Sequence, residues 1–154
     1  MSSAIGAERL KKTRAIVEAA IAKLGLDPKK SVVNESAEQV SWTLARGSAN
    51  VVITVVHRPE QKNVFFRVAA PVMTPDSAAA KEPLYRRLLE MNAGGLANAS
   101  FGLLGDKIVA VSERPADGLD ESEADQMIRH LSAVADTFDD RLVREFGGKR
   151  ASDG

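Results

Sequence analysis

The residue types best suited to acid–base chemistry or metal binding are scarce in this sequence. It contains two histidines, His57 and His130, and no cysteine. His57 lies at the end of a predicted strand, and His130 lies beside the apolar stripe of a predicted helix. Two histidines cannot form a three-histidine zinc site, and neither has a second histidine four residues away on a helix. We therefore predict no metal site and no catalytic residue, although a catalytic histidine can use partners that are remote in sequence.

Three acidic residues lie close together on the last predicted helix: Asp136, Asp139 and Asp140. This cluster suggests a site for a hard cation, but such sites usually take their oxygen ligands from flexible loops or several elements. Asp140 precedes Arg144 by four residues, and Asp125 precedes Arg129 by four, which is the favourable order for ion pairs along a helix. The pattern therefore favours a salt-bridged, solvated helix face over a metal site.

The glycine-rich run at residues 94–102 invites comparison with a phosphate-binding loop. Such a loop joins a strand to a helix and carries Lys-Ser or Lys-Thr, whereas this run leaves a predicted helix and enters a predicted strand. Its glycines are better explained by the end of the helix and by close packing around the strand. No serine lies in a Gly-x-Ser-x-Gly elbow. The sequence therefore predicts no cofactor.

Composition excludes several classes of protein. The chain has 154 residues, which fits one domain with its own core, and its 21 basic residues balance 21 acidic ones. Zero net charge and an aromatic content of 5% argue against nucleic-acid binding. No apolar run reaches the roughly 20 residues of a membrane span. Met1 to Gly6 lacks the features of a signal peptide, so we expect a cytoplasmic protein.

Apolar residues recur with helical spacing in three stretches of the chain. The first helix is expected at residues 7–24, where a glycine follows. The second is expected from Pro83 to just before Gly94, because proline suits the first turn of a helix. The last is expected from Asp120, which starts a motif like a capping box, to Phe146.

Strands are predicted between these helices, because apolar and polar residues alternate there. They are expected around residues 40–45, 50–57, 63–73, 97–104 and 107–113, and residues 31–35 are a candidate for a short leading strand. Short polar links favour an antiparallel meander. The element order is therefore α-β-β-β-α-β-β-α, an α+β fold with a twisted antiparallel sheet.

One feature of these strands bears on function. The strand at 50–57 is apolar on both faces, which is typical of a central strand covered on both sides. Val52 and Val56 form its second apolar face, and Phe65 lies on the second face of the next strand. If helices cover only the other face, these three residues form an exposed apolar patch, and such patches usually mark an interface. The alternative is that a helix of the same chain covers them.

The second half of the sequence contains five informative short strings: Leu84 to Ala93, Phe101 to Leu103, Gly105 to Val109, Leu119-Asp120, and Ala135 to Leu142. These strings resemble the YbjN-like proteins, and the first looks like the LL-x-x-N helix of that family. Together they cover about residues 84–148, and the N-terminal half matches in element order only. That order is similar to the order of type III secretion chaperones, small acidic dimers that hold segments of partner proteins. The even balance of 21 acidic and 21 basic residues departs from that acidic character, and the family supplies no catalytic residue.

We predict a single domain at residues 1–148, followed by a disordered tail at 149–154. The first and last helices are expected mainly on one face of the sheet, and the second helix at an edge or interface. The expected function is that of a non-enzymatic protein-binding module, a homodimeric chaperone or adaptor. We assign partner binding to Val52, Val56 and Phe65.

Dimerisation is assigned to the stripe of the second helix, which contains Leu84, Leu88 and Met91. Two alternatives remain from other classes of protein. A regulatory domain would bind a small ligand in an apolar pocket with converging polar groups. An enzyme would place a carboxylate beside His57 in a cleft.

Overall fold

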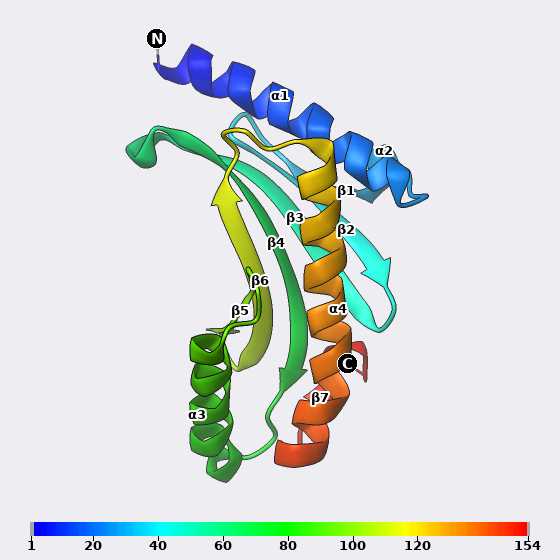
Figure 1. The fold of residues 1–154 in the computed structure, drawn as a ribbon, viewed down its shortest axis with the longest axis vertical. Helices are drawn as coiled ribbons and strands as arrows, with labels where there is room; N and C mark the ends of the chain where they lie inside the picture. The colour runs from blue at the N-terminus through cyan, green and yellow to red at the C-terminus, as the bar shows by residue number, and fades with distance from the viewer. Residues whose placement is uncertain (1, 154) are drawn as a thin grey trace. The chain divides into compact units, whose positions relative to one another are not determined.

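The computed structural model describes residues 2–153 and shows a mixed fold of helices and antiparallel strands (Figure 1). The first half contains α1 (Ser2–Lys23), α2 (Pro28–Ser31), β1 (Val32–Glu35), β2 (Gln39–Arg46), β3 (Ala49–Arg58), the 3-10 helix η1 (Pro59–Gln61) and β4 (Asn63–Thr74). The second half contains α3 (Ala78–Gly94), β5 (Ser100–Leu104), β6 (Lys107–Pro115), α4 (Glu121–Phe146), β7 (Lys149–Arg150) and the 3-10 helix η2 (Ala151–Asp153). Among the described residues, no helix is both long and apolar enough to cross a membrane.

The strands form one sheet in the order β1-β2-β3-β4-β6-β5, and β7 pairs with β4. The pairs β1–β2, β5–β6 and β4–β7 are antiparallel. A register shift between Val32 and Asn34 interrupts the first of these pairs. The antiparallel sheet with helices at both ends of the chain confirms the predicted α+β class.

The chain forms two compact units that share several long elements. Unit 1 contains residues up to 44, 52–68 and 113–129, and unit 2 contains 45–51, 69–112 and 130 onward. Strands β2, β3, β4 and β6 and helix α4 each contribute residues to both units. Whether the chain folds as the single domain expected from its length stays a prediction.

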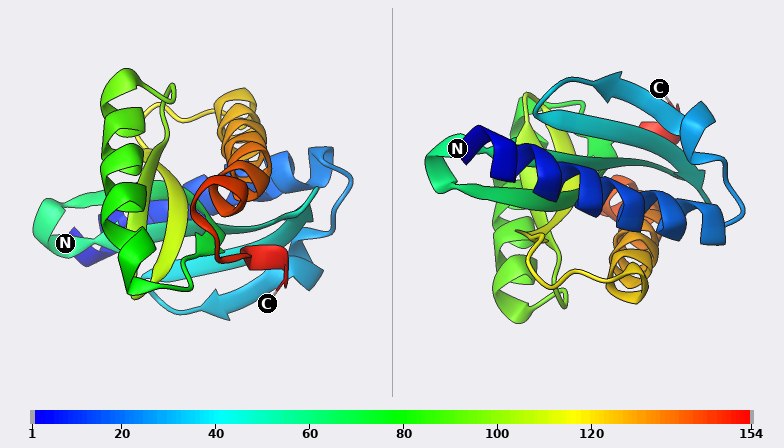
Figure 2. Two further views of the ribbon diagram at one scale, coloured as in Figure 1. Left: turned by 90° about the horizontal axis from the view of Figure 1, so that it is seen from below. Right: turned by 90° about the horizontal axis from the view of Figure 1, so that it is seen from above.

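Unit 1 is built on the first helix and the first strands. Figure 2 shows α1 running across the strands of this unit, and the α1 residues Val17, Ala20 and Ile21 are fully buried. Trp42 and Phe66 are also fully buried on the strands. Val17 and Ile21 lie at helical spacing on α1, and Trp42 and Phe66 lie at alternating positions on their strands, which is why the pattern in the sequence predicts these four as core.

Unit 2 places α3 beside β5 (Figures 1 and 2). The side-chain amide of Asn92 at the end of α3 donates to the carbonyl oxygen of Phe101 at 3.0 Å and accepts from its backbone N–H at 2.8 Å. The Phe101 ring meets the Phe138 ring edge-to-face, with 5.6 Å between the centroids. Asn92 therefore fixes one edge of β5 to α3, while Phe101 packs against α4.

The predicted helix ends are close to the observed ones at α4 and differ at α3. The Asp120 carboxylate accepts the backbone N–H of Glu123 at 2.7 Å, which is the cap expected before α4. Helix α3 begins at Ala78 rather than at Pro83, because the hydroxyl of Ser77 caps it by accepting the N–H of Ala80 at 3.3 Å. The proline therefore lies inside the helix instead of at its start.

The predicted disordered tail is ordered in the structure as far as Asp153. Lys149 and Arg150 pair with the last two residues of β4, and η2 follows. Gly148 makes this approach possible, because its φ is 95° and a Cβ there would lie 2.2 Å from the carbonyl oxygen of Thr74. The prediction missed this strand because its partner lies about 75 residues earlier in the chain, so no local pattern reveals it.

Candidate functional site

Strands β3 and β4 have two different faces in unit 1. Ile53, Val55 and Phe66 are fully buried, whereas Val52, Val56 and Phe65, the three residues assigned to partner binding, are only half-buried. Side chains alternate between the faces of a sheet, so the half-buried set lies opposite the core. The structure thus leaves this second face partly open to solvent within the described chain.

Arg58 lies over Phe65 and belongs to a cluster of three charged side chains. The Arg58 guanidinium lies 4.6 Å from the centre of the Phe65 ring, which is within cation–π range. Arg58 also binds the Glu113 carboxylate at 2.5 Å, and Arg67 lies 3.8 Å from the same oxygen. Two guanidinium groups therefore share one carboxylate, which leaves one positive charge in excess. We call the surface formed by Val52, Val56 and Phe65, with the flanking charged residues Arg58, Arg67 and Glu113, the apolar face.

The residues assigned to dimerisation do not lie on the exposed side of α3. Leu84 is 0% exposed and Leu88 is buried, whereas Met91 is half-buried. Leu84 and Leu88 pack inside the protomer, so they present no surface to a second copy, and the assignment of these two residues needs correction. Helical spacing shows that a stripe shares one side of a helix, but it does not show which of two apolar sides faces inward.

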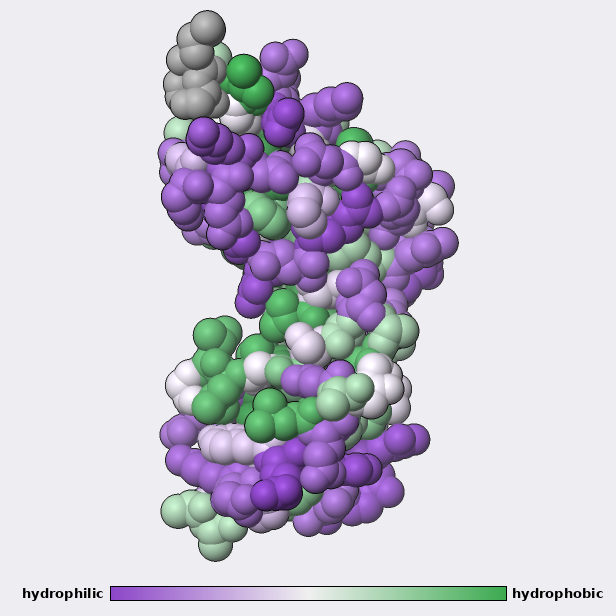
Figure 3. Space-filling view, turned by 60° about the vertical axis from the view of Figure 1, so that its left-hand side comes forward, coloured by the Kyte–Doolittle hydropathy of each residue, from purple (hydrophilic) through white to green (hydrophobic). Residues whose placement is uncertain are grey.

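The large apolar side chain that is exposed on the described α3 is instead Leu89, which is 68% exposed. Leu103 and Leu104 on β5 are the other large apolar side chains exposed in the described part of unit 2. Figure 3 shows hydrophobic side chains gathered in the region that contains α3 and β5. We call Leu89, Leu103 and Leu104, together with the outer side of α3, the α3–β5 surface.

The two histidines occupy ordinary structural positions. The ring of His57 packs against Gly6, where a Cβ would lie 2.5 Å away, and the backbone N–H of His57 donates to the carbonyl oxygen of Glu38 at 2.8 Å. A ring nitrogen of His130 lies 2.8 Å from the carbonyl oxygen of Leu96. Across residues 2–153, no group of three or more His, Cys, Asp and Glu side chains is placed to hold a metal ion.

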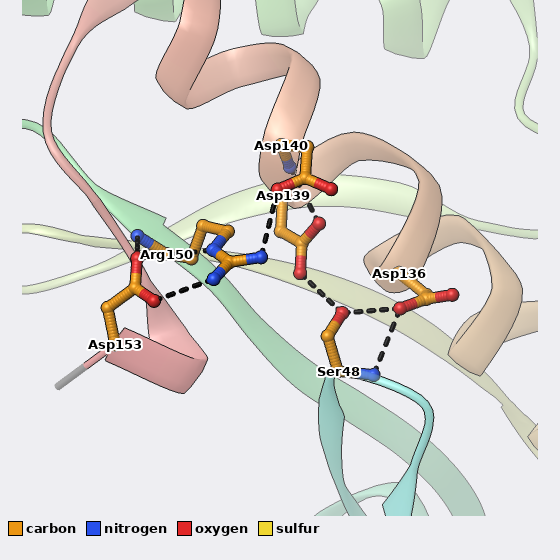
Figure 4. Close-up of polar contacts among 6 residues, drawn as sticks. All are labelled: Ser48, Asp136, Asp139, Asp140, Arg150 and Asp153. Carbon is orange, nitrogen blue, oxygen red and sulfur yellow. Dashed lines mark hydrogen bonds and ion pairs between the residues drawn. The ribbon is translucent and has the colours of Figure 1, made fainter.

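The acidic cluster of α4 makes hydrogen bonds to another element of unit 2 (Figure 4). The carboxylate of Asp136 accepts hydrogen bonds from the backbone N–H of Ser48, at 3.0 Å, and from its hydroxyl. The same hydroxyl lies 2.6 Å from the carboxylate of Asp139, which is buried. The two donors of Ser48 stabilise the charged form of Asp136 and lower its pKa below the usual value. These bonds tie the β2–β3 turn to α4.

The remaining acid of the cluster binds the C-terminal segment. Asp140 binds Arg150 at 3.0 Å, rather than the Arg144 that its spacing suggested, and Arg150 also binds Asp153 at 2.8 Å. The Arg150 guanidinium lowers the pKa of Asp153. The other predicted pair, Asp125 with Arg129, forms at 2.9 Å. Only Asp140 of the cluster is ion-paired, and Asp139 is buried, so the predicted solvated, salt-bridged face is wrong for Asp136 and Asp139, which bond to Ser48 instead.

Comparison with known proteins adds to this geometry. Residues 11–154 match the model of the TY-Chap1 family, described as T3SS (YopN, CesT) and YbjN peptide-binding chaperone 1. The chain belongs to the TY-Chap1 family. The match covers nearly the whole sequence, which confirms the resemblance that the strings in the second half carried. No curated protein matches the sequence.

Two solved structures share the fold of this TY-Chap1 member. A chain in the crystal structure of the ExsC–ExsE complex aligns with a TM-score of 0.58 and 15% identity. The alignment covers 86% of the present chain and 93% of the chain in that complex. The structure of the HopA1–SchA chaperone–effector complex aligns with a TM-score of 0.54 and 11% identity, over 87% of this chain and 91% of that one. At such low identity the likeness concerns the fold alone.

Proposed function

We propose that this TY-Chap1 protein is a non-enzymatic, homodimeric chaperone or adaptor that holds a segment of a partner protein on its apolar face. The observation that carries the proposal is the half-buried state of Val52, Val56 and Phe65. Membership of a family of peptide-binding chaperones supports it, as does the fold shared with structures of complexes.

The chemistry of the apolar face suits an extended segment. Alternate side chains of such a segment point to one side, so its apolar residues can cover Val56 and Phe65 together. Removing apolar surface from water contributes about 25 cal/mol per Å². The guanidinium groups of Arg58 and Arg67 share a single carboxylate, so they can also pair with an acidic side chain of the segment. Binding therefore combines burial with charge recognition.

The α3–β5 surface, together with the half-buried Met91, is the proposed dimer contact, in place of the buried Leu84 and Leu88. A shallow groove of about 770 Å³ follows the outer side of α3, and its lining includes Tyr85 and Leu89. The lining also contains two basic and two acidic side chains: Lys81, Arg86, Glu82 and Glu90. A twofold dimer brings the same surface together from both copies. Two antiparallel copies of α3 can therefore bury both Leu89 side chains and set bases against acids.

Partner capture tests the proposed binding face. The native partner is first identified by capture from lysate and mass spectrometry, and its affinity is then measured with purified proteins. We expect Val56→Asp and Phe65→Asp to weaken binding at least about tenfold, because each buries a charge against an apolar segment. The matched control is Val33→Asp, at an apolar residue that is 62% exposed on β1.

The outcome separates the parts of this proposal. Unchanged partner affinity in folded Val56→Asp and Phe65→Asp variants would contradict the assignment of the apolar face. The dimer is tested separately by light scattering after size exclusion, in which Leu89→Asp should shift the mass toward the monomer. A strictly monomeric wild type would rule the dimer out and leave the binding face untouched.

A further inference from the structure

A small pocket lies in unit 1, outside the apolar face. Helix α1, the first two residues of β4 and the loop at residues 116–119 line it, and all of its lining residues belong to unit 1. Its volume of about 260 Å³ is below the roughly 300–1,000 Å³ of clefts for drug-sized ligands. The pocket therefore suits a small molecule or a single residue of a chain. We call it the α1 pocket.

Helix α1 contributes four side chains to this pocket: Arg9, Lys12, Thr13 and Ile16. They are spaced by three and four residues, so they lie on the same side of the helix. Within about two helical turns, this side combines two cations, a hydroxyl group and an apolar side chain. The residue types therefore favour a ligand that has both a charged and an apolar part.

Thr13 is the least ordinary member of the lining. It is only 5% exposed, and its hydroxyl forms no hydrogen bond with any residue in the range 2–153. Buried hydroxyls are nearly always bonded, because an unpaired one costs free energy. A hydroxyl both donates and accepts a hydrogen bond. Because Thr13 lines the α1 pocket, a ligand there can supply the missing partner.

The charges around the pocket do not balance. Asp117 is the one acidic residue of the lining, and Arg9 lies 3.8 Å from its carboxylate. This distance is too long for a hydrogen bond, so the donors of Arg9 stay available to a ligand. Lys12 is exposed and pairs with no acid of the described chain, including Glu8 one turn earlier. The lining therefore carries one positive charge in excess, which complements a monoanion.

The apolar part of the lining narrows the chemistry of the ligand. Val64 and Leu119 are buried, and Ile16 is half-buried. An inorganic anion leaves these side chains without a partner. A carboxylate on a short aliphatic group matches both parts, because its oxygens can accept hydrogen bonds from Lys12 and Thr13 while its carbon atoms cover the apolar residues.

The wall formed by β4 and the loop is held in place by hydrogen bonds of the protein. The backbone N–H of Ala116 donates to the carbonyl oxygen of Val64 at 2.8 Å. The side-chain amide of Asn63 donates to the Asp117 carboxylate at 3.2 Å, and Arg114 donates to the Asp117 carbonyl oxygen at 2.8 Å. Binding therefore requires little ordering of this wall, which is a cost that otherwise reduces affinity.

We infer that the α1 pocket binds a small aliphatic carboxylate, with the carboxylate against Lys12 and Thr13. Two sources share this chemistry: a free carboxylic acid, and the C-terminal residue of a polypeptide. The inference goes beyond the proposed function and does not depend on it, because no residue of the apolar face lines the pocket.

Titrations of the full chain, followed by amide chemical shifts, test the inference. The first probe is 3-methylbutanoate, and its match is the uncharged 3-methylbutanamide. We expect the carboxylate to move resonances at residues 9–16 and 116–119, and the amide to bind at least about tenfold more weakly. The second probe is acetyl-Gly-Gly-Leu with a free or an amidated C-terminus. The free tripeptide binds at least as tightly as 3-methylbutanoate if the source is a chain end, and more weakly if it is a free acid.

Two neighbouring lysines provide a matched pair of variants. Lys12 lines the pocket, whereas Lys11 is exposed and does not. We expect Lys12→Gln and Thr13→Val each to lose at least about threefold in affinity for 3-methylbutanoate, and Lys11→Gln to keep it. Thr13→Val should not lower the midpoint of urea unfolding, because it removes a buried hydroxyl that has no protein partner. Circular dichroism establishes that each variant is folded.

Several results would overturn the inference. Equal affinity for the carboxylate and the amide would do so, as would unchanged affinity in Lys12→Gln or in Thr13→Val. Equal shifts of the same resonances by inorganic phosphate at the same concentration would assign the pocket to any anion. Partner binding by the apolar face is measured separately, so failure of the carboxylate removes the α1 pocket alone.

Discussion

Leu84 and Leu89 lie on the same helix, and their exposed fractions in the protomer are 0% and 68%. Replacing a fully buried leucine by alanine lowers the unfolding free energy by about 2.7–5 kcal/mol. The loss has two parts, the transfer free energy of the removed atoms and the cost of the cavity that they leave. Replacing an exposed leucine typically changes the unfolding free energy by no more than about 0.5 kcal/mol. For a chain of this size, each kcal/mol lowers Tm by roughly 2–4 °C. We therefore expect Leu84→Ala to lower Tm by about 5–20 °C and Leu89→Ala by at most about 2 °C.

Urea unfolding followed by far-UV circular dichroism measures the difference directly. It should be repeated at several protein concentrations, because dimerisation adds a stability that depends on concentration. At low concentration the two variants should differ by at least about 2 kcal/mol with an unchanged dependence on urea. At high concentration Leu89→Ala should lose the part of the stability that comes from the dimer. A cost below about 1 kcal/mol for Leu84→Ala, or equal costs for both variants, would refute the assignment of the inner and outer sides of α3.

Three further predictions follow from single contacts. Gly148→Ala should detach the C-terminal strand, because the new Cβ collides with backbone at a positive φ; faster amide hydrogen exchange at residues 149–153 measures this. Asn92→Ala should cost about 1–3 kcal/mol in urea unfolding, because it removes two hydrogen bonds to the backbone of Phe101. The lowered pKa of Asp136 means that its bonds to Ser48 stabilise the fold above about pH 4 and are lost as the pH falls through the lowered value. The gap in unfolding free energy between the wild type and Ser48→Ala should therefore narrow as the pH falls below about 4, and a constant gap would contradict this.

Several features of the protein could be predicted from local patterns alone. Val52 lies on one face of its strand, and Ile53 and Val55 lie on the other. This alternation involves only neighbouring residues, so the sequence alone predicted a strand with two apolar faces. The cap at Asp120 needs only residues three positions apart, so the start of α4 was also readable. The ion pair between Asp125 and Arg129 was also predictable, because it joins residues about one helical turn apart. The antiparallel sheet followed from the short links between its strands.

The candidate sites were only partly predictable. The sequence named Val52, Val56 and Phe65 because an apolar surplus is visible in the pattern, and the structure places all three at half-buried positions. It could not identify Arg58 as the side chain that stacks on Phe65, because the two residues lie on different strands. The signal that could have identified it is its position at the end of the same alternating face as Val56.

Tertiary structure alone decided the features that depend on remote residues. The side of α3 that faces inward depends on what packs against it, and the periodicity of a helix carries no information about its neighbours. The order in residues 149–153 depends on a pairing with β4 and on ion pairs to Asp140. One groove of unit 2 is lined by residues within 45–50, 71–74 and 149–152 and by Lys107, which come from four distant parts of the chain. Local patterns therefore determined the elements, while contacts between remote segments decided which surfaces remain free for a ligand.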